Sequence, residues 1–378
     1  MLILNNCFDV RSLILAAALF TGLGHVTRAS AQEYVLVDLN SRTITELGIL
    51  DDGLSSANDI NDAGQVVGWS GLLAGEGRRA FITGPDGIGM KGLGTLGGDS
   101  YAEGINDAGQ VVGWSETADG PSHAFITGPT GMGMRDLGTL GGSWSYGNGI
   151  NNTGQVVGES TTAEGYYHAF ITGPGEMGLR DLGTLGGGWS YASGINDAGQ
   201  VVGDSYTAED DDHAFITGPG EIGIRDLGTL GGGYSEASGI NESGQVVGWS
   251  WTAENLSHAF ITGPDGMGMR DLGTFGGAHS KAFGINNAGQ VVGTSETTTG
   301  EFHAFITGPD GLDMTDLNSL VNLPEGVILT EARGINNNGQ VIAVETLVPE
   351  PEPYVLMLAG LGLLGFMIRR KKAENQLG

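Results

Sequence analysis

One 45-residue pattern repeats through almost the whole chain. The segment G-I-N-x-x-G-Q-V-V-G recurs seven times with small variations, and its glutamines are 45 residues apart except at the last interval of 50. Two further segments, A-F-I-T-G-P and D-L-G-T-L-G-G, recur between these copies. A unit of this size cannot bury its own apolar faces, so neighbouring units must stack on one another. The repeated glutamines are Gln65, Gln110, Gln155, Gln200, Gln245, Gln290 and Gln340.

Seven such units occupy residues 32–346, since Glu33–Leu39 stands where A-F-I-T is expected in the first unit. Each unit offers four short strands: A-F-I-T, M-R-D-L-G-T, S-x-A-x-G-I-N and Q-V-V-G-W-S. In N-x-x-G the asparagine opens a turn and the glycine supplies its left-handed residue. Units of ~40–50 residues with four strands are typical of propeller blades. The sequence predicts an all-β fold, a seven-bladed β-propeller, with an open β-solenoid as the alternative.

The composition agrees with strands and tight turns. Glycine supplies 70 of the 378 residues, and the absence of a Gly-X-Y period excludes collagen. The 44 acidic residues outnumber the 16 basic ones, which gives a formal net charge of −28. This charge would repel a phosphate backbone, so nucleic acid is not an expected partner.

Residues 1–31 have the features of a secretory signal peptide. Arg11 precedes an apolar stretch over residues 12–24, and Ala29-Ser30-Ala31 provides a cleavage site of small residues. The single cysteine, Cys7, lies before the apolar stretch and leaves with the signal. The mature chain is therefore expected to have no disulfide, no cysteine metal site and no cysteine nucleophile.

Residues 347–378 form a tail of different character. Val348, Pro349, Glu350 and Pro351 open it, and residues 354–368 carry no charge. A helix over 354–368 would span about 22 Å of a ~30 Å hydrocarbon core, and snorkelling basic side chains cover part of the difference. The positive-inside rule keeps the basic cluster cytoplasmic and the body of the protein outside. That cluster is Arg369, Arg370, Lys371 and Lys372.

The V-P-E-P motif, the Gly/Leu-rich apolar helix and the basic cluster together resemble the PEP-CTERM sorting signal. In that family an exosortase recognises and processes the tail during export in Gram-negative bacteria that make exopolysaccharide. The resemblance implies an exosortase-type enzyme as a partner, a transient anchor in the inner membrane, and a final place at the cell surface or in the extracellular matrix. A plain C-terminal anchor, the alternative, would keep the protein in the inner membrane.

In five units a histidine precedes A-F-I-T, and these triplets resemble the HAF repeats of bacterial extracellular proteins. The second unit has Arg79-Ala80-Phe81 instead, and the first unit lacks the triplet. The resemblance implies export and a repeat scaffold and brings no known chemistry. The five histidines are His123, His168, His213, His258 and His303.

Residues that recur once per unit are expected to be structural, because the ligands of a metal must converge on one point. This applies to the five histidines. Repeated Arg-Asp pairs, such as Arg135-Asp136, have two interpretations. They form structural pairs within or between blades, which we favour, or a ring of carboxylates that holds a cation in a central channel. No metal site is predicted, and calcium is the one cofactor left open.

Positions that vary against the repeat are the best candidates for a binding site. One position after each Gly-Gly, and a second two residues further on, carry mostly aromatic side chains. Equivalent loops of adjacent blades would place them on one rim, where rings stack on apolar sugar faces or only cover the blade ends. A third variable position, including Trp69, Glu159 and Asp204, is expected to be an outward strand end. The predicted ligand-binding residues are Trp144, Tyr146, Trp189, Tyr191, Tyr234 and His279.

We expect a non-enzymatic, exported surface or matrix protein that adheres to or organises exopolysaccharide. A lectin-like or calcium-dependent binding propeller is one alternative. A polysaccharide hydrolase or lyase is another, but it needs acid and base residues that converge. No catalytic residue is predicted, because the residues that break the repeat lie in different units; they are Asp99, Asp204, Glu236, His279 and Lys281.

Overall fold

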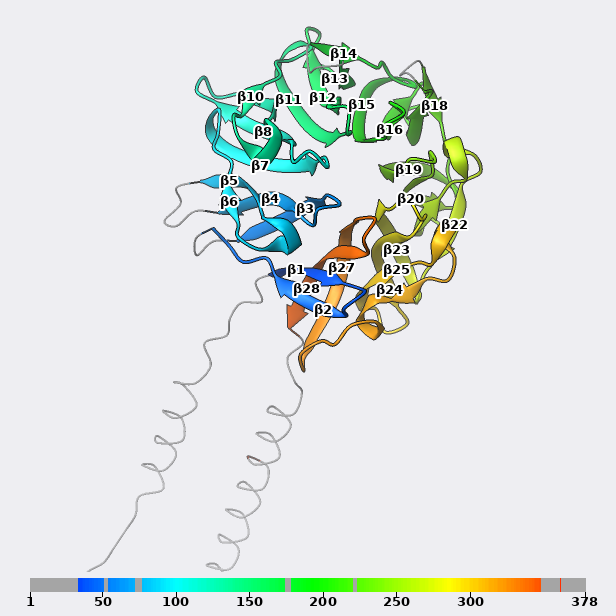
Figure 1. Ribbon diagram of the computed structural model, residues 1–378. Helices are drawn as coiled ribbons and strands as arrows, with labels where there is room; N and C mark the ends of the chain where they lie inside the picture. The colour runs from blue at the N-terminus through cyan, green and yellow to red at the C-terminus, as the bar shows by residue number, and fades with distance from the viewer. Residues whose placement is uncertain are drawn as a thin grey trace, which may run out of the picture. The chain divides into compact units, whose positions relative to one another are not determined.

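A computed structural model describes residues 33–50, 54–71, 77–173, 178–219 and 223–347, together with residue 361. Within residues 33–347 the described chain forms seven four-stranded antiparallel blades round a central axis (Figure 1). Blades 4 and 5 are joined into one sheet by a single parallel pair, Asp212 with Tyr234. The predicted signal peptide, the sorting motif and all but one residue of the predicted apolar helix lie outside the described residues.

The two inner strands of each blade come from S-x-A-x-G-I-N and Q-V-V-G-W-S, and we number the blades from β3 in chain order. The first strands are β3 (Ser55–Ile60), β7 (Gly97–Ile105), β11 (Gly141–Ile150), β15 (Gly186–Ile195), β19 (Gly231–Ile240), β23 (Gly276–Ile285) and β27 (Val327–Ile335). The second strands are β4 (Val66–Gly71), β8 (Val111–Thr117), β12 (Val156–Thr162), β16 (Val201–Thr207), β20 (Val246–Thr252), β24 (Val291–Thr297) and β28 (Gln340–Leu347).

The two outer strands come from A-F-I-T and M-R-D-L. The third strands are β5 (Arg78–Ile82), β9 (Ser122–Ile126), β13 (Tyr167–Thr172), β17 (Asp212–Thr217), β21 (Ser257–Ile261), β25 (Phe302–Ile306) and β1 (Glu33–Asp38). The fourth strands are β6 (Lys91–Gly92), β10 (Arg135–Asp136), β14 (Leu179–Asp181), β18 (Ile224–Asp226), β22 (Arg270–Gly273), β26 (Thr315–Asp316) and β2 (Thr43–Glu46). Short 3₁₀ turns occur at η2 (Pro85–Gly87), η3 (Pro129–Gly131), η4 (Pro264–Gly266), η5 (Pro309–Gly311) and η6 (Leu317–Ser319).

The sequence unit is displaced from the blade by two strands, so that each unit supplies the outer half of one blade and the inner half of the next. Blade 7 is therefore built from both ends of the chain, in the order β2-β1-β28-β27. Strands β1 and β28 pair along their length, from Glu33 opposite Glu345 to Asp38 opposite Gln340. This pairing closes the ring, and the free outer edge of each blade is a strand of only 2–4 residues. The propeller prediction is confirmed, and the open solenoid is wrong.

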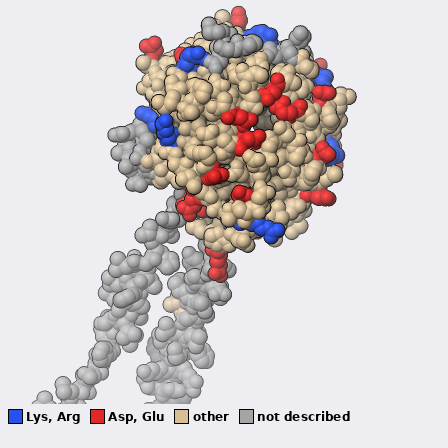
Figure 2. Space-filling view, in the orientation of Figure 1, with Lys and Arg blue, Asp and Glu red and all other residues tan. Residues whose placement is uncertain are grey.

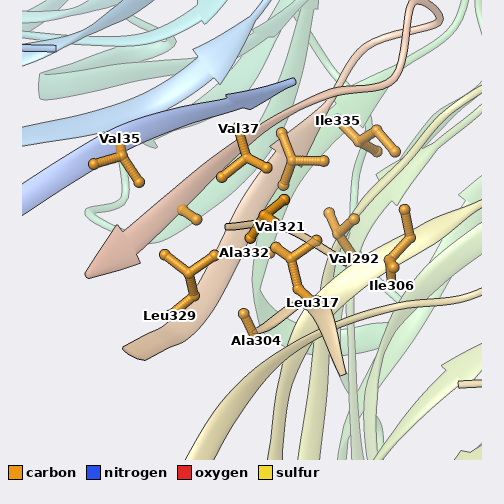
Figure 3. Packing of buried hydrophobic residues seen from close by; sticks show 12 residues of the cluster. Val35, Val37, Val292, Ala304, Ile306, Leu317, Val321, Leu329, Ala332 and Ile335 are labelled. Carbon is orange, nitrogen blue, oxygen red and sulfur yellow. The ribbon is translucent and has the colours of Figure 1, made fainter. Parts of the chain in front are cut away.

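Apolar side chains fill the seams between blades. At the seam of blades 3 and 4, Val157 and Ile171 pack with Val201 and Phe215 of the next blade. Figure 3 shows the corresponding cluster where blades 6 and 7 meet, to which β1 contributes Val35. The phenylalanine of A-F-I-T is at most 1% exposed in six blades, so six of the seven seams receive one large ring, and aliphatic side chains alone fill the seam between blades 6 and 7. Burying such a ring stabilises the fold by roughly 1.5–3 kcal/mol.

The glycine of Q-V-V-G is required by the close approach of the first and second strands. A Cβ at Gly158 would lie 1.9 Å from the carbonyl oxygen of Tyr146. The pairing of these strands shifts register between Gly147 and Gly149, which is a β-bulge. No residue with a side chain fits at Gly158 unless the two strands move apart.

A belt of seven asparagines ties each blade to the next. The Nδ2 group of each donates to the backbone carbonyl oxygen of the equivalent asparagine in the next blade, at 3.0–3.4 Å. The Oδ1 atom accepts the backbone N–H of the glutamine four residues later at 2.9–3.0 Å and so fixes the hairpin turn. These buried residues, the asparagine belt, are Asn61, Asn106, Asn151, Asn196, Asn241, Asn286 and Asn336.

A second ring of hydrogen bonds follows the asparagine belt on its exposed side. The residue after each belt asparagine donates its backbone N–H to a side-chain oxygen of the equivalent residue in the next blade, at 2.7–3.2 Å. Aspartate, asparagine and glutamate all serve here, because each presents an oxygen acceptor. The residues are Asp62, Asp107, Asn152, Asp197, Glu242, Asn287 and Asn337.

Replacing Asn196 by alanine would remove one bond across a seam and two bonds to Gln200 within its own hairpin turn. The N–H and the side-chain oxygen of Gln200 would lose these partners in a buried site, whereas the carbonyl oxygen of Asn241 would still accept the N–H of Gly244. We expect the free energy of unfolding to fall by about 1–3 kcal/mol for each group left unpaired. Urea denaturation measures this loss. Glu254→Ala at an exposed loop should change stability by less than ~0.5 kcal/mol, and equal effects of the two changes would contradict the role of the belt.

Candidate functional site

The two faces of the ring have different roles. The first strand of each blade ends at the asparagine belt, and we call that side the belt face. We call the opposite side, where the first strands begin, the aromatic face. The belt face carries the same bonds in every blade, whereas the predicted rim residues lie near the beginnings of β11, β15, β19 and β23 on the aromatic face. Variation between the blades is therefore concentrated on the aromatic face.

The structure brings some of the six predicted ligand-binding residues together and separates others. Tyr146, Trp189 and Tyr191 all lie within 6.3 Å of the Tyr167 ring, measured between ring centroids. Trp144 is 39% exposed, and none of the ring contacts found among the described residues involves it. The two other predicted residues, Tyr234 and His279, lie in different surroundings in blades 5 and 6.

Tyr234 stands in a separate aromatic stack in blade 5. Its ring lies 4.6 Å from Trp249 and 5.5 Å from Trp251. His279 in blade 6 is held by a hydrogen bond of 3.0 Å between its Nδ1 and the hydroxyl of Ser257. The predicted rim thus consists of two aromatic groups, Trp144 outside both of them, and one histidine fixed by a serine.

A continuous ladder of aromatic rings crosses blades 1–4, and the sequence interpretation missed most of it. Successive ring centroids are 3.9–6.3 Å apart. The contacts from Trp69 to Tyr146 alternate between edge-on and stacked, and Tyr167 then stacks on both Trp189 and Tyr191. Tyr166 also meets Trp189 edge-on at 6.1 Å. The available signal was Tyr166-Tyr167, because no other unit has two aromatic residues directly before its H-A-F triplet. The aromatic ladder consists of Trp69, Tyr101, Trp114, Tyr146, Tyr167, Trp189 and Tyr191.

The expectation that Trp69, Glu159 and Asp204 mark outward strand ends is wrong. Their position lies within the second strand of each blade and pairs with the first strand, as Tyr191 pairs with Asp204. A second strand has a strand on either side and a neighbouring blade against its faces, so these side chains are partly buried. Trp69 accordingly contacts Tyr101 of the next blade at 5.7 Å.

Four carboxyl groups gather beside the ladder, in blades 3–5. Burial, together with the charges of Asp212, Glu236 and Glu159, raises the pKa of Asp204 to about 8. Burial likewise raises the pKa of Glu159 to about 7 and that of Asp212 to about 6. The Asp212 Oδ1 atom is buried and has no hydrogen-bond partner among the described residues. Asp204 and Glu236, which lie in different sequence units, are therefore neighbours in space.

The repeated histidines pair with the repeated aspartates of the same blade. The Nδ1–Oδ2 distance is 2.8–2.9 Å in all five pairs, such as His168 with Asp181. The repeated arginine reaches the next blade instead, since Arg270 donates to the carbonyl oxygen of Asp310. These residues are structural, and the carboxylate-ring interpretation of the aspartates is wrong because they lie on the outermost strands. Among the described residues, no three His, Cys, Asp or Glu side chains are arranged so that they could hold a metal ion.

Charge is unevenly distributed over the surface. On the face visible in Figure 2, acidic side chains gather round the centre while lysine and arginine side chains lie towards the edge. A ligand that approaches the central channel therefore meets a negative potential.

The tail matches a known sorting signal. A model of the PEP-CTERM protein-sorting motif matches residues 347–371, which confirms that prediction and indicates an exported, exosortase-sorted cell-surface protein. No curated protein matches the chain. None of the helices within the described part of the chain is long and apolar enough to cross a membrane.

A solved propeller with an unrelated sequence shares the fold. The β-propeller domain of the trilobed protease from Pyrococcus furiosus, described as having an open velcro topology, aligns with a TM-score of 0.54 and 12% identity over 77% of this chain and 87% of that one. TolB from Acinetobacter baumannii aligns with a TM-score of 0.46 and 10% identity over 91% of this chain and 71% of that one. At this identity the first likeness supports the fold alone. The chain is thus an exported β-propeller with a PEP-CTERM sorting motif.

The carboxyl groups make a pH dependence of stability testable. A raised pKa means that the folded protein keeps a proton that the unfolded chain has released, so stability falls as pH rises from about 4 towards about 8. We expect the melting temperature to be higher at pH 5 than at pH 8 by at least ~2 °C. Scanning calorimetry measures this difference. Asp204→Asn should reduce it while Glu254→Gln does not, and an unchanged profile in Asp204→Asn would contradict the assignment.

Proposed function

We propose that this protein is an exported, non-enzymatic propeller that binds polysaccharide through its aromatic face and holds it at the cell surface or in the matrix. The observation that carries the proposal is the aromatic ladder, which runs unbroken from blade 1 to blade 4. Trp144 and Trp189, near the beginnings of neighbouring first strands, are 39% and 37% exposed.

The chemistry of these rings suits sugars. Aromatic faces pack on the apolar C–H surfaces of sugar rings, while tyrosine O–H and tryptophan N–H groups supply hydrogen bonds. Rings fixed by their neighbours lose little conformational freedom when a ligand arrives. Because equivalent positions recur in adjacent blades, one extended polymer can contact several of them at once, and such contacts add avidity.

Charge narrows the class of polymer. The chain carries a formal net charge of −28, and four carboxyl groups lie beside the ladder. A strongly acidic polysaccharide would be repelled. The proposal therefore favours a neutral or amino-containing polymer.

The test is co-sedimentation of the purified protein with exopolysaccharide from the source cells, with and without calcium. The double variant Trp144→Ala/Trp189→Ala should bind at least tenfold more weakly, which corresponds to about 1.4 kcal/mol. Met267→Ala is the matched control, because Met267 is 65% exposed and follows the η4 turn on the belt face. Binding that needs calcium but not the tryptophans, or no binding at all, would contradict the proposal.

The group of carboxyls gives a second candidate, cleavage of a glycosidic bond. A general acid needs a carboxyl that stays protonated near neutral pH, and burial places Asp204 in that state. Release of reducing ends from the bound polymer, abolished in Asp204→Asn, would support this function over simple binding. Intact polymer after prolonged incubation would exclude it.

A further inference from the structure

On its aromatic-face side, the central channel widens into a cavity of about 400 Å³. This volume is at the small end of the ~300–1,000 Å³ range of small-molecule sites. Six of the seven residues that line it occupy one position of the repeat, two residues before the isoleucine of G-I-N. The lining consists of Asn58, Glu103, Asn148, Ser193, Phe283 and Arg333 at that position, together with Glu331.

This position varies much more than its neighbours along the same strands. The next residue is aspartate, Asp59, in blade 1 and glycine in the six other blades, and the isoleucine and asparagine that follow are constant. The repeat thus keeps the channel wall uniform except at this mouth, which carries five different residue types in seven blades. Packing alone does not require such differences, since serine is accommodated at Ser193 and Ser238.

The hydrogen bonds of the lining leave the mouth rich in acceptors. Both N–H groups of Asn58 are occupied, by the carbonyl oxygen of Ala102 and the carboxylate of Glu103 at 2.9 Å. The Nδ2 group of Asn148 donates to the Glu159 carboxylate at 2.6 Å and to a backbone carbonyl. The Glu103 carboxylate also accepts a hydrogen bond from the Trp114 side chain. The amide oxygen of Asn148 and the lone pairs of Glu103 that Asn58 and Trp114 do not use are therefore the groups left for a ligand.

The charges of the mouth also favour a cation. Among the described residues that line it, Arg333 is the one cation, and its Nε donates to the Glu331 carboxylate at 2.6 Å. The Arg333 guanidinium also lies over the Tyr34 ring at 5.3 Å. Glu103 and, deeper in the channel, Asp59 add two further acidic groups. Burial raises the pKa of Glu103 to about 7 and that of Asp59 to about 6, so their negative charge is greatest above neutral pH. Phe283 supplies an aromatic wall, whose face attracts cations.

We propose that this channel mouth binds a protonated primary amine carried by a small polyhydroxylated ligand, as in an amino-sugar residue. An ammonium group has three N–H donors and no acceptor, which complements a mouth that offers carboxylates, an amide oxygen and an aromatic ring. The inference rests on the proposed polysaccharide function and names the sugar class: polymers with free amino groups bind more tightly than fully N-acetylated or neutral ones.

The test compares D-glucosamine, N-acetyl-D-glucosamine and D-glucose by titration calorimetry. The protein is the full chain, kept in a detergent without a sugar headgroup. Glucosamine should bind at least tenfold more tightly than the other two sugars. Glu103→Gln, which keeps an acceptor for Asn58, should abolish the preference, whereas Glu242→Gln at the belt-face mouth should preserve it. Equal affinities for the three sugars, or equal effects of the two changes, would overturn the inference.

Two further variants keep the outcome interpretable. Phe283→Ser introduces the residue that blades 4 and 5 carry at this position, so the fold should tolerate it, and glucosamine binding should weaken several-fold. Trp144→Ala/Trp189→Ala should weaken polysaccharide binding and leave the preference for glucosamine unchanged. Loss of polysaccharide binding in the tryptophan variant without any preference for glucosamine would leave the proposed function standing and refute this inference alone.

Discussion

The hydrogen bond from each belt asparagine to the next blade is the interaction on which the ring depends. Each of these side chains acts twice, since Oδ1 shapes the hairpin of its own blade and Nδ2 donates to the neighbouring blade. The bond from Asn336 to Asn61 joins blade 7 to blade 1, across residues that are 275 positions apart in the sequence. Because the buried side-chain amide of a belt asparagine both donates and accepts hydrogen bonds, neither aspartate nor alanine can replace it. Aspartate has no donor, and alanine leaves two groups unpaired.

Because the belt and the seams satisfy the backbone in the same way in every blade, other positions are free to differ. Those positions lie on the aromatic face and at the channel mouth below it, where the blades carry Trp, Tyr, Glu, Asp, Phe and Arg in turn. The result is a symmetric scaffold with an asymmetric surface. Trp114 and Tyr146 meet across a seam only because the belt holds their blades at a fixed spacing.

The sequence predicted the features that depend on local chemistry. The 45-residue repeat predicted seven blades. The N-x-x-G motif predicted the hairpin turn in which Gly154 takes a φ of 80°. Contacts between units were not predictable in the same way. Arg135 is adjacent to Asp136 in the sequence, yet the partner of Asp136 is His123, thirteen residues earlier on the neighbouring strand. Asp204 and Glu236 meet because two strands from different units lie side by side, which depends on blade geometry.

The central claim is that the two chain ends and the belt close one cooperative ring. Hydrogen exchange of the seven glutamine backbone amides that donate to the belt tests it most directly, because each blade supplies one such amide. The account predicts one common slow rate, since no blade can open without breaking two seams. Fast exchange of the Gln340 amide in blade 7, while the amides of blades 2–5 stay protected, would contradict it.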